Sequence, residues 1–183
     1  MEIKEFLAKL RQYWIENEVP NITDENADFL TDIIRKNKFK NWLEIWTANG
    51  YSTICLASAL KENDWHITSI EFSIWSHNQA INNIKEVWLE NICTLIHGQA
   101  LDVIPTLEDG SFDFVFIDGM KRRSKDFLEL CWPKAKAGSI IIIDDVIKFK
   151  AKMVWLYEYL EEKWIRYEVL QIDVDDGIMM IRR

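Results

Sequence analysis

Five short apolar runs, separated by stretches with helical spacing, are the feature that most constrains how this 183-residue chain can fold. A strand that is apolar at every position is buried on both faces, which is typical of parallel sheets covered by helices. The runs lie at residues 42–46, 67–70, 92–96, 112–117 and 140–143, and helices are expected at 53–61, 76–87, 124–134 and 150–163. This alternation predicts an α/β fold with a doubly wound, mostly parallel sheet.

The two ends of the chain depart from this alternation. Apolar residues recur with helical spacing over residues 3–14, and residues 21–24 offer N-cap candidates for a second helix through about Asn37. Strands at 167–172 and 178–181 flank an Asp-Gly turn, which predicts a C-terminal antiparallel hairpin. No linker-like composition separates these parts. We therefore expect a single domain over residues 1–183, with two N-terminal helices over 1–40 and the α/β core over 41–183.

Composition narrows the class of protein. The chain is 49% hydrophobic with a formal net charge of −8, so it can bury a core but lacks a global basic surface for nucleic acid. No apolar run approaches the ~20 residues that span a bilayer, and the first residues lack the apolar stretch of a signal peptide. Cys55, Cys93 and Cys131 are too scattered for a disulfide framework or a zinc site. We therefore expect a cytoplasmic protein without a membrane segment.

Charged side chains follow several of the predicted strands where each strand ends. Glu71 closes the second strand, Asp118 and Lys121 follow the fourth, and Asp144 and Asp145 follow the fifth. Because ligands bind beyond the carboxyl ends of the strands in such sheets, these side chains are candidates for one shared site. Acidic residues at strand ends are also common as turn formers and helix caps, and that interpretation stays open for each of them alone.

From about residue 41 to residue 183, these motifs resemble the class I S-adenosylmethionine-dependent methyltransferases. The resemblance is to the metal-dependent O-methyltransferase branch of catechol and caffeoyl-CoA type, some bacterial members of which methylate a hydroxylated tRNA uridine. Residues 43–52 resemble the first motif, an acid-x-Gly-x-x-x-Gly turn, and residues 98–100 resemble the family's Gly-Asp-Ala, with Gln99 in place of Asp. The resemblance implies a Rossmann-like fold.

The resemblance also implies an S-adenosyl-L-methionine site. Glu71 corresponds to the acid that accepts the ribose hydroxyls, and Gln99 can still hydrogen-bond adenine through its amide. The residues that correspond to the cofactor site are Glu44, Trp46, Ala48, Gly50, Ser52, Glu71, Phe72, Gln99, Ala100 and Asp118.

The catalytic half of the motif set implies a metal and a base. Asp118, Asp144 and Asp145 correspond to the family's metal ligands, usually Asp, Asp and Asn, and such hard oxygen ligands suit Mg²⁺ or another divalent cation. Lys121 corresponds to the general base. Metal and lysine together would lower the pKa of an acceptor hydroxyl, whose oxygen would then attack the sulfonium methyl group.

Tryptophan and glycine occur in unusual proportions. The chain has nine tryptophans but only six glycines, where about 7% glycine is usual. Trp46 stands where the first motif has a glycine, so an indole there would narrow the methionine end of the cofactor pocket. Some bacteria read the codon UGA as glycine, and a common translation table writes it as tryptophan. The candidates for such misassigned glycines are Trp46, Trp65, Trp75, Trp88, Trp155 and Trp164.

The acceptor and the partners are less constrained. Two basic clusters follow active-site strands, and both are expected to rim the same pocket: Lys121, Arg122, Arg123 and Lys125, and Lys148, Lys150 and Lys152. They favour a hydroxyl-bearing acceptor that is anionic, such as a CoA ester or a tRNA nucleoside, and a small phenol is the simplest alternative. Many relatives are dimers, so a homodimer is a further expectation. The competing hypothesis is a non-catalytic protein that keeps the fold while Trp46 blocks its cofactor site.

Overall fold

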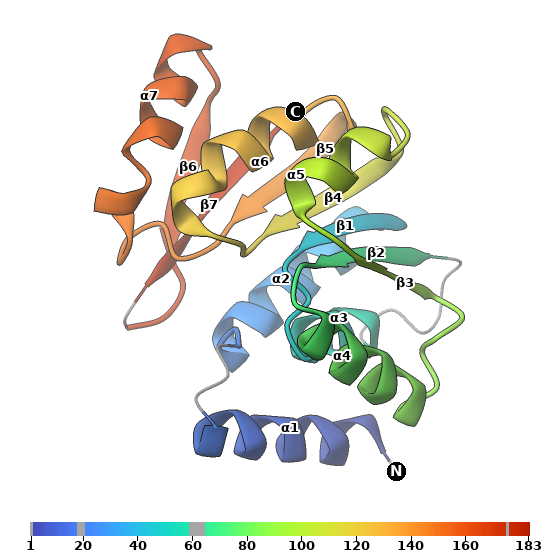
Figure 1. Cartoon of the computed structure of the whole chain (residues 1–183). Coiled ribbons are helices and arrows are strands. Elements are labelled where there is room, and N and C mark those ends of the chain that lie inside the picture. Colours follow the sequence, from blue (N-terminus) through green and yellow to red (C-terminus); the bar gives the residue numbers. More distant parts are fainter. Residues whose placement is uncertain (1, 18–20, 59–64, 175) are drawn as a thin grey trace.

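A seven-stranded sheet forms the centre of the molecule in the computed structural model, which describes residues 2–17, 21–58, 65–174 and 176–183 (Figure 1). The strand order is β3-β2-β1-β4-β5-β7-β6. The strands are β1 (Asn41–Ile45), β2 (His66–Glu71), β3 (Cys93–His97), β4 (Phe112–Ile117), β5 (Ala135–Ile143), β6 (Tyr167–Gln171) and β7 (Gly177–Arg182). The first five are parallel, and β7 runs antiparallel to both β5 and β6. The predicted doubly wound sheet with a C-terminal hairpin is confirmed.

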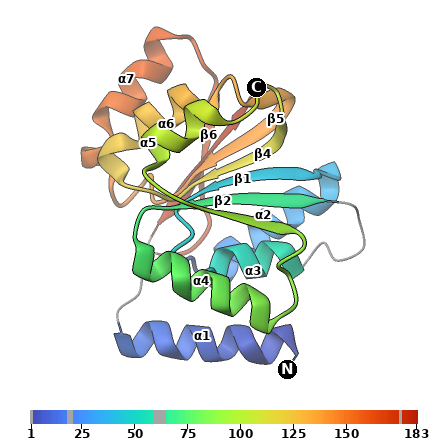
Figure 2. The ribbon, with the colours of Figure 1, turned by 45° about the vertical axis from the view of Figure 1, so that its right-hand side comes forward.

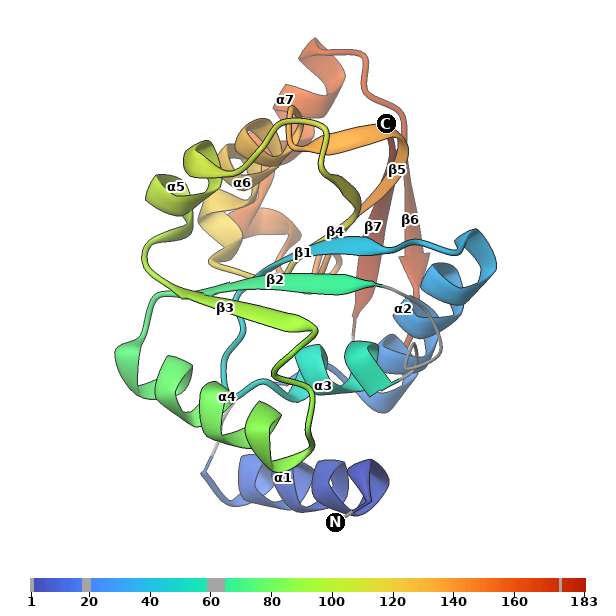
Figure 3. The ribbon, with the colours of Figure 1, turned by 90° about the vertical axis from the view of Figure 1, so that its right-hand side faces the viewer.

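Helices cover both faces of this sheet (Figures 1 and 2). One layer contains α2 (Asp24–Asn37), α3 (Tyr51–Ser58) and α4 (Ile74–Glu86), and α1 (Ile3–Asn17) packs against α3 on the side away from the sheet (Figure 1). The other contains α5 (Ala100–Val103), α6 (Ser124–Cys131) and α7 (Val154–Glu162). Figure 3 shows the sheet from its β3 side, with the hairpin strands β6 and β7 at the back. No helix within the described ranges is long and apolar enough to cross a membrane.

The strands bury alternate residues into two separate cores because neighbouring side chains of a strand point to opposite faces. Trp42, Phe114 and Ile142 pack towards the layer of α2 to α4, and Leu43 and Val115 pack towards the layer of α5 to α7. All five side chains are at most 1% exposed. The apolar runs that form β1, β2, β4 and β5 are therefore largely buried, as predicted. The prediction was wrong for the run at residues 92–96, because β3 is the edge strand of the sheet and its residues are half-buried or exposed.

Several element boundaries differ from the prediction. β5 begins at Ala135 instead of residue 140, because Ala135 pairs with Phe112 on the far side of a register shift. The sequence Lys-Ala-Gly-Ser at residues 136–139 has no apolar run that would predict a strand there. The last predicted helix begins with a 3-10 turn at Lys150–Lys152, and α7 follows it. Residues 59–61, the predicted end of the helix after the first strand, lie outside the described residues.

We expect Phe114→Ala to lower the free energy of unfolding by about 3–5 kcal/mol, because it opens a cavity under the centre of the sheet. Val154→Ala, at a side chain that is 49% exposed, is the control and should change it by under ~0.5 kcal/mol. Denaturant titration followed by circular dichroism measures both values. Equal losses for the two variants would contradict this description of the core.

Candidate active site

The carboxyl ends of the parallel strands meet at one edge of the sheet. The register pairs Ile45 with Ile70 and Ile117, and Ile117 with Ile143, so the residues that follow these strands emerge side by side. Residues 46–50, Glu71, Asp118 and Asp144 are thereby gathered at this edge. Residues that follow separate strands therefore lie together at one edge of the sheet, as expected, while their functional roles stay predictions.

The loop after β1 makes a tight turn towards α3. The N–H groups of Trp46 and Thr47 both donate to the Ile70 carbonyl, at 2.9 and 3.3 Å, and the Gly50 N–H donates to the Thr47 carbonyl at 2.9 Å. Gly50 has a φ of +88°, and a Cβ at this position would lie 3.3 Å from the Cβ of Ala80. Glycine is therefore required here both by the backbone and by the close approach of α4.

Glu71 ties two loops of the site together. Its Oε2 accepts the Ala48 N–H at 2.8 Å, and its Oε1 accepts the Ser73 N–H at 2.7 Å. The side chain is only 2% exposed. Each carboxylate oxygen has two lone pairs, so both oxygens keep the capacity to accept a further hydrogen bond, such as one from a ribose hydroxyl.

Glu44 lies behind the loop in a buried hydroxyl network. Its carboxylate accepts hydrogen bonds from Ser52 and Ser69, at 2.5 and 2.6 Å, and from Thr53. Burial raises the pKa of Glu44 above its usual range, and the three hydroxyl donors oppose that shift. Glu44 and Ser52 therefore join β1, β2 and the start of α3, and a part in cofactor binding through the shape of the loop stays a prediction for both.

We expect Glu44→Gln to change the pH dependence of stability. Because the folded-state pKa is raised, ionised Glu44 costs stability once the pH exceeds its unfolded value near 4.5, and the cost disappears as the pH falls. The free energy of unfolding of Glu44→Gln relative to the unmodified chain should therefore rise with pH through this range. Urea titrations at a series of pH values measure it, and a difference that stays constant would contradict the assignment.

A cavity of about 370 Å³ opens next to the loop. It contains four of the predicted cofactor residues, Trp46, Phe72, Gln99 and Ala100, whereas Ala48, Gly50 and Glu71 shape the neighbouring backbone. The other residues that line the cavity are Ile45, Ile70, Gly98, Leu101, Met120, Arg123 and Phe127. Of these, Phe127 gave no functional signal in the sequence, because its spacing is that of a core residue of a helix.

Trp46 forms part of the cavity wall. Its φ is +89°, outside the range that tryptophan normally adopts. Its ring carbon Cε3 lies 3.5 Å from the point where a Cβ on Gly119 would stand, which places the indole between the loop and the end of β4. The indole therefore lines the cavity and is not packed in the core. This position agrees with the expectation that Trp46 narrows the pocket.

Lys121 lies between two of the predicted metal ligands. Its Nζ is 2.8 Å from Asp118 Oδ1 and 2.8 Å from Asp145 Oδ2. Asp144 is 4% exposed, and its Oδ1 accepts a hydrogen bond from Asn26 Nδ2 at 3.3 Å. Within the described part of the chain, no three Asp, Glu, His or Cys side chains are arranged to hold a metal ion together. The ammonium group of Lys121 is the cation at this position.

Two of these carboxylates have raised pKa values. Burial, followed by repulsion from Asp118, raises the pKa of Asp144 well above its usual range, and burial also raises the pKa of Asp118. Desolvation is the larger cause of both shifts, and repulsion between the carboxylates is the smaller one. Carboxylate oxygens are the kind of hard ligand that a divalent cation such as Mg²⁺ prefers, so the chemistry of these side chains fits such an ion.

Lys121 is held in its charged form. Burial alone would lower the pKa of Lys121, but the attraction of Asp118, Asp145 and Asp144 overrides it and raises the pKa above its usual range. A lysine in this state cannot act as a base until its ion pairs are weakened. Asp145, with a φ of +60°, occupies a left-handed backbone position that Asp and Asn tolerate better than most residues.

The basic clusters are only partly directed at the cavity. Arg123 lines it, although its guanidinium also pairs with Asp126 at 2.8 Å. Lys125 pairs with Glu129 at 2.6 Å, and the Lys148 and Lys152 ammonium groups lie over the ring of Phe149. Among the described lining residues, Arg123 alone comes from these clusters. That both clusters rim one pocket stays a prediction.

Comparison with known proteins places this geometry in context. Residues 43–146 match the family model described as a methyltransferase domain. The chain is similar to catechol O-methyltransferases of Mycobacterium tuberculosis (29% identity over 72% of the chain) and Niastella koreensis (30% over 70%). The matches cover 60% and 59% of those two proteins, so the chain spans about three fifths of their length. The structure of an O-methyltransferase from Bacillus cereus in complex with SAH superposes with a TM-score of 0.84 at 25% identity, covering 98% of this chain and 91% of that one.

Proposed function

We propose a methyl-transfer reaction for this chain, which belongs to the methyltransferase domain family and, within it, to the O-methyltransferases of the catechol and caffeoyl-CoA type. The chain would transfer the methyl group of S-adenosylmethionine to a hydroxyl group of an acceptor. The observation that carries the proposal is the position of the charged cluster: Lys121 directly follows Met120, which lines the cavity, and its Nζ contacts Asp118 and Asp145.

The cofactor would occupy the cavity between the β1 loop and residues 98–101. Glu71 would accept the ribose hydroxyls through its remaining lone pairs, and Gln99 and Ala100 would border the adenine. Trp46, at the inner wall, is the residue that would meet the methionine end of the cofactor. This arrangement follows the chain order of the motifs and the positions of their residues around the cavity.

Asp118, Asp144 and Asp145 would hold a divalent cation, which when bound lowers the pKa of an acceptor hydroxyl. These residues also orient Lys121, whose Nζ both Asp118 and Asp145 contact. Lys121 would accept the hydroxyl proton once its own ion pairs have been weakened. The acceptor oxygen would then attack the methyl carbon, and the C–S bond of the cofactor would break as the new O–C bond forms.

The acceptor would be a small phenol or an anionic hydroxyl compound. Met120 and Phe127 supply apolar surface in the cavity, and Arg123 supplies a positive charge that suits a carboxylate, a CoA ester or a tRNA phosphate. The alternative is a non-catalytic protein in which Trp46 obstructs the cofactor. Catechol and caffeoyl-CoA are the first acceptors to test, with tRNA that contains a hydroxylated uridine as the third.

Glu71→Ala should weaken S-adenosylmethionine binding by about 1–3 kcal/mol, because it removes the proposed hydrogen bonds to a charged group. Titration calorimetry in a Trp46→Gly background measures the effect. Glu168→Ala, which removes an exposed acid of β6, is the control and should leave affinity unchanged. Equal affinities for the two variants would contradict the role of Glu71.

Methyl transfer in the Trp46→Gly background should require a divalent cation and stop in excess EDTA. Asp144→Asn should lose activity by about 10²-fold or more, because it removes a buried charge from the site. Transfer of a radiolabelled methyl group to catechol gives the rate, with Asp102→Ala, at an exposed acid, as the control. Full turnover in excess EDTA would contradict the proposed role of the metal, but it would not contradict methyl transfer itself.

A further inference from the structure

Three tryptophans have a backbone conformation that belongs to glycine. Trp46, Trp88 and Trp164 have φ angles of +89°, +58° and +55°. In this region the Cβ of an L-residue crowds the neighbouring carbonyl, and a bulky residue there is a true outlier. Within the described residues, the other non-glycine residues with positive φ are Lys38, Ala48 and Asp145. Tryptophan therefore accounts for an unexpected share of these positions.

Trp88 and Trp164 both end a helix in the same hydrogen-bonded motif. After α4, the Trp88 N–H donates to the Lys85 carbonyl and the Leu89 N–H donates to the Ile84 carbonyl. After α7, the Trp164 N–H donates to the Glu161 carbonyl and the next N–H donates to the Leu160 carbonyl. This pair of bonds defines the Schellman motif, whose left-handed residue is usually glycine. Lys38 fills the same place after α2, so a side chain is possible there although it is strained.

The two indoles gain nothing that would offset this strain. Trp88 is 79% exposed and Trp164 is 91% exposed. Trp42 and Trp65 behave in the opposite way, since they are 1% and 5% exposed and their rings stack at 4.9 Å. Trp65, which the sequence suggested as a misassigned glycine, is therefore a packed tryptophan of the core, and that expectation was wrong.

Trp46 shows the same mismatch inside the candidate active site. Its φ of +89° nearly equals the +88° of Gly50, the other end of the same turn, and lies beyond the usual left-handed range of L-residues. Its indole forms part of the cavity wall. Trp75 and Trp155 are also exposed, but they lie within α4 and α7, whose backbone does not call for glycine.

We propose that positions 46, 88 and 164 are glycine in the protein as its own cell makes it, because the gene has UGA codons there that the cell decodes as glycine. The excess of tryptophan over glycine in the sequence has the same explanation. At positions 88 and 164 the inference rests on the backbone alone. At position 46 it also rests on the proposed function, since glycine there would open the methionine end of the cofactor cavity.

The gene and the native protein test the proposal directly. Codons 46, 88 and 164 should be UGA, and codons 42 and 65 should be UGG. Tandem mass spectrometry of peptides from the protein purified from its own cells should then read glycine at the first three positions and tryptophan at the other two. A UGG codon, or a tryptophan in the peptides, at any of the three positions would overturn the assignment for that position, whatever the activity of the protein.

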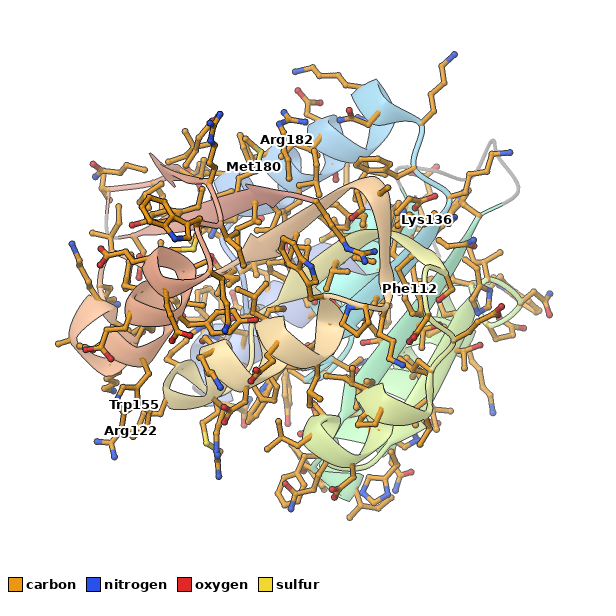
Figure 4. All side chains as sticks on the ribbon, turned by 90° about the horizontal axis from the view of Figure 1, so that it is seen from above. Phe112, Arg122, Lys136, Trp155, Met180 and Arg182 are labelled. Atoms are coloured by element: carbon orange, nitrogen blue, oxygen red, sulfur yellow. The ribbon has the colours of Figure 1, made fainter. Side chains whose placement is uncertain are left out.

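Stability of the recombinant chain tests the backbone argument separately. Trp88→Gly and Trp164→Gly should each raise the Tm by about 2–4 °C, because glycine removes strain of about 1 kcal/mol. Trp88→Ala removes the same indole but keeps a Cβ, so it should give no increase. Trp155→Gly, at an exposed helical position whose ring points outward at the rim of the molecule (Figure 4), should lower the Tm. Equal shifts for Trp88→Gly and Trp88→Ala would overturn the strain argument.

Binding of SAH tests position 46. We expect Trp46→Gly to bind SAH at least tenfold more tightly than the chain with tryptophan, measured by calorimetry, and Trp46→Ala to fall between them. Equal binding by the unmodified chain and Trp46→Gly would overturn the role of position 46 as the gate of the cavity. Absence of binding by both chains would count against the proposed function, while the codons and peptide masses would still decide the identity of the residue.

Discussion

In-register pairing of the parallel strands is the constraint on which the rest of this structure depends. Because β1 pairs with both β2 and β4, and β4 pairs with β5, the chain leaves four strands at the same edge. Glu71, Asp118 and Asp144 are distant in sequence, yet the register places them around one site. The two helical layers hold this register, since a slip by one residue would turn every buried side chain to the opposite face.

In the charged cluster at this edge, one lysine partly neutralises the carboxylates around it. Asp118, Asp144 and Asp145 repel one another when they are ionised, which destabilises the folded state. Lys121 offsets part of this repulsion because its ammonium group attracts all three carboxylates. The same contacts that stabilise the carboxylates keep the lysine protonated. A divalent cation and the lysine would therefore compete for the same oxygen atoms, so metal binding and the availability of a base are linked in this arrangement.

The loop after β1, residues 46–50, has a backbone that suits glycine better than the tryptophan at its start. Its hydrogen bonds and the close approach of α4 define a turn with three positive-φ positions, 46, 48 and 50. Gly50 satisfies the turn, and Trp46 does not. The same disagreement at two exposed helix ends, where no ligand is involved, indicates that the cause lies in the identity of the residue and not in the function of the site.

The sequence by itself determined the parallel sheet, the C-terminal hairpin and the order of the site motifs, because apolar periodicity and turn residues are local signals. It also marked Trp46 and the acids at the strand ends. Only the tertiary structure decided that Glu44 is bound by three hydroxyl groups, that Lys121 bridges Asp118 and Asp145, and that β5 starts at Ala135. It also showed that Trp65 packs on Trp42, whereas Trp88 and Trp164 occupy backbone positions that favour glycine. Burial and backbone strain depend on partners far along the chain, which is why local patterns do not contain them.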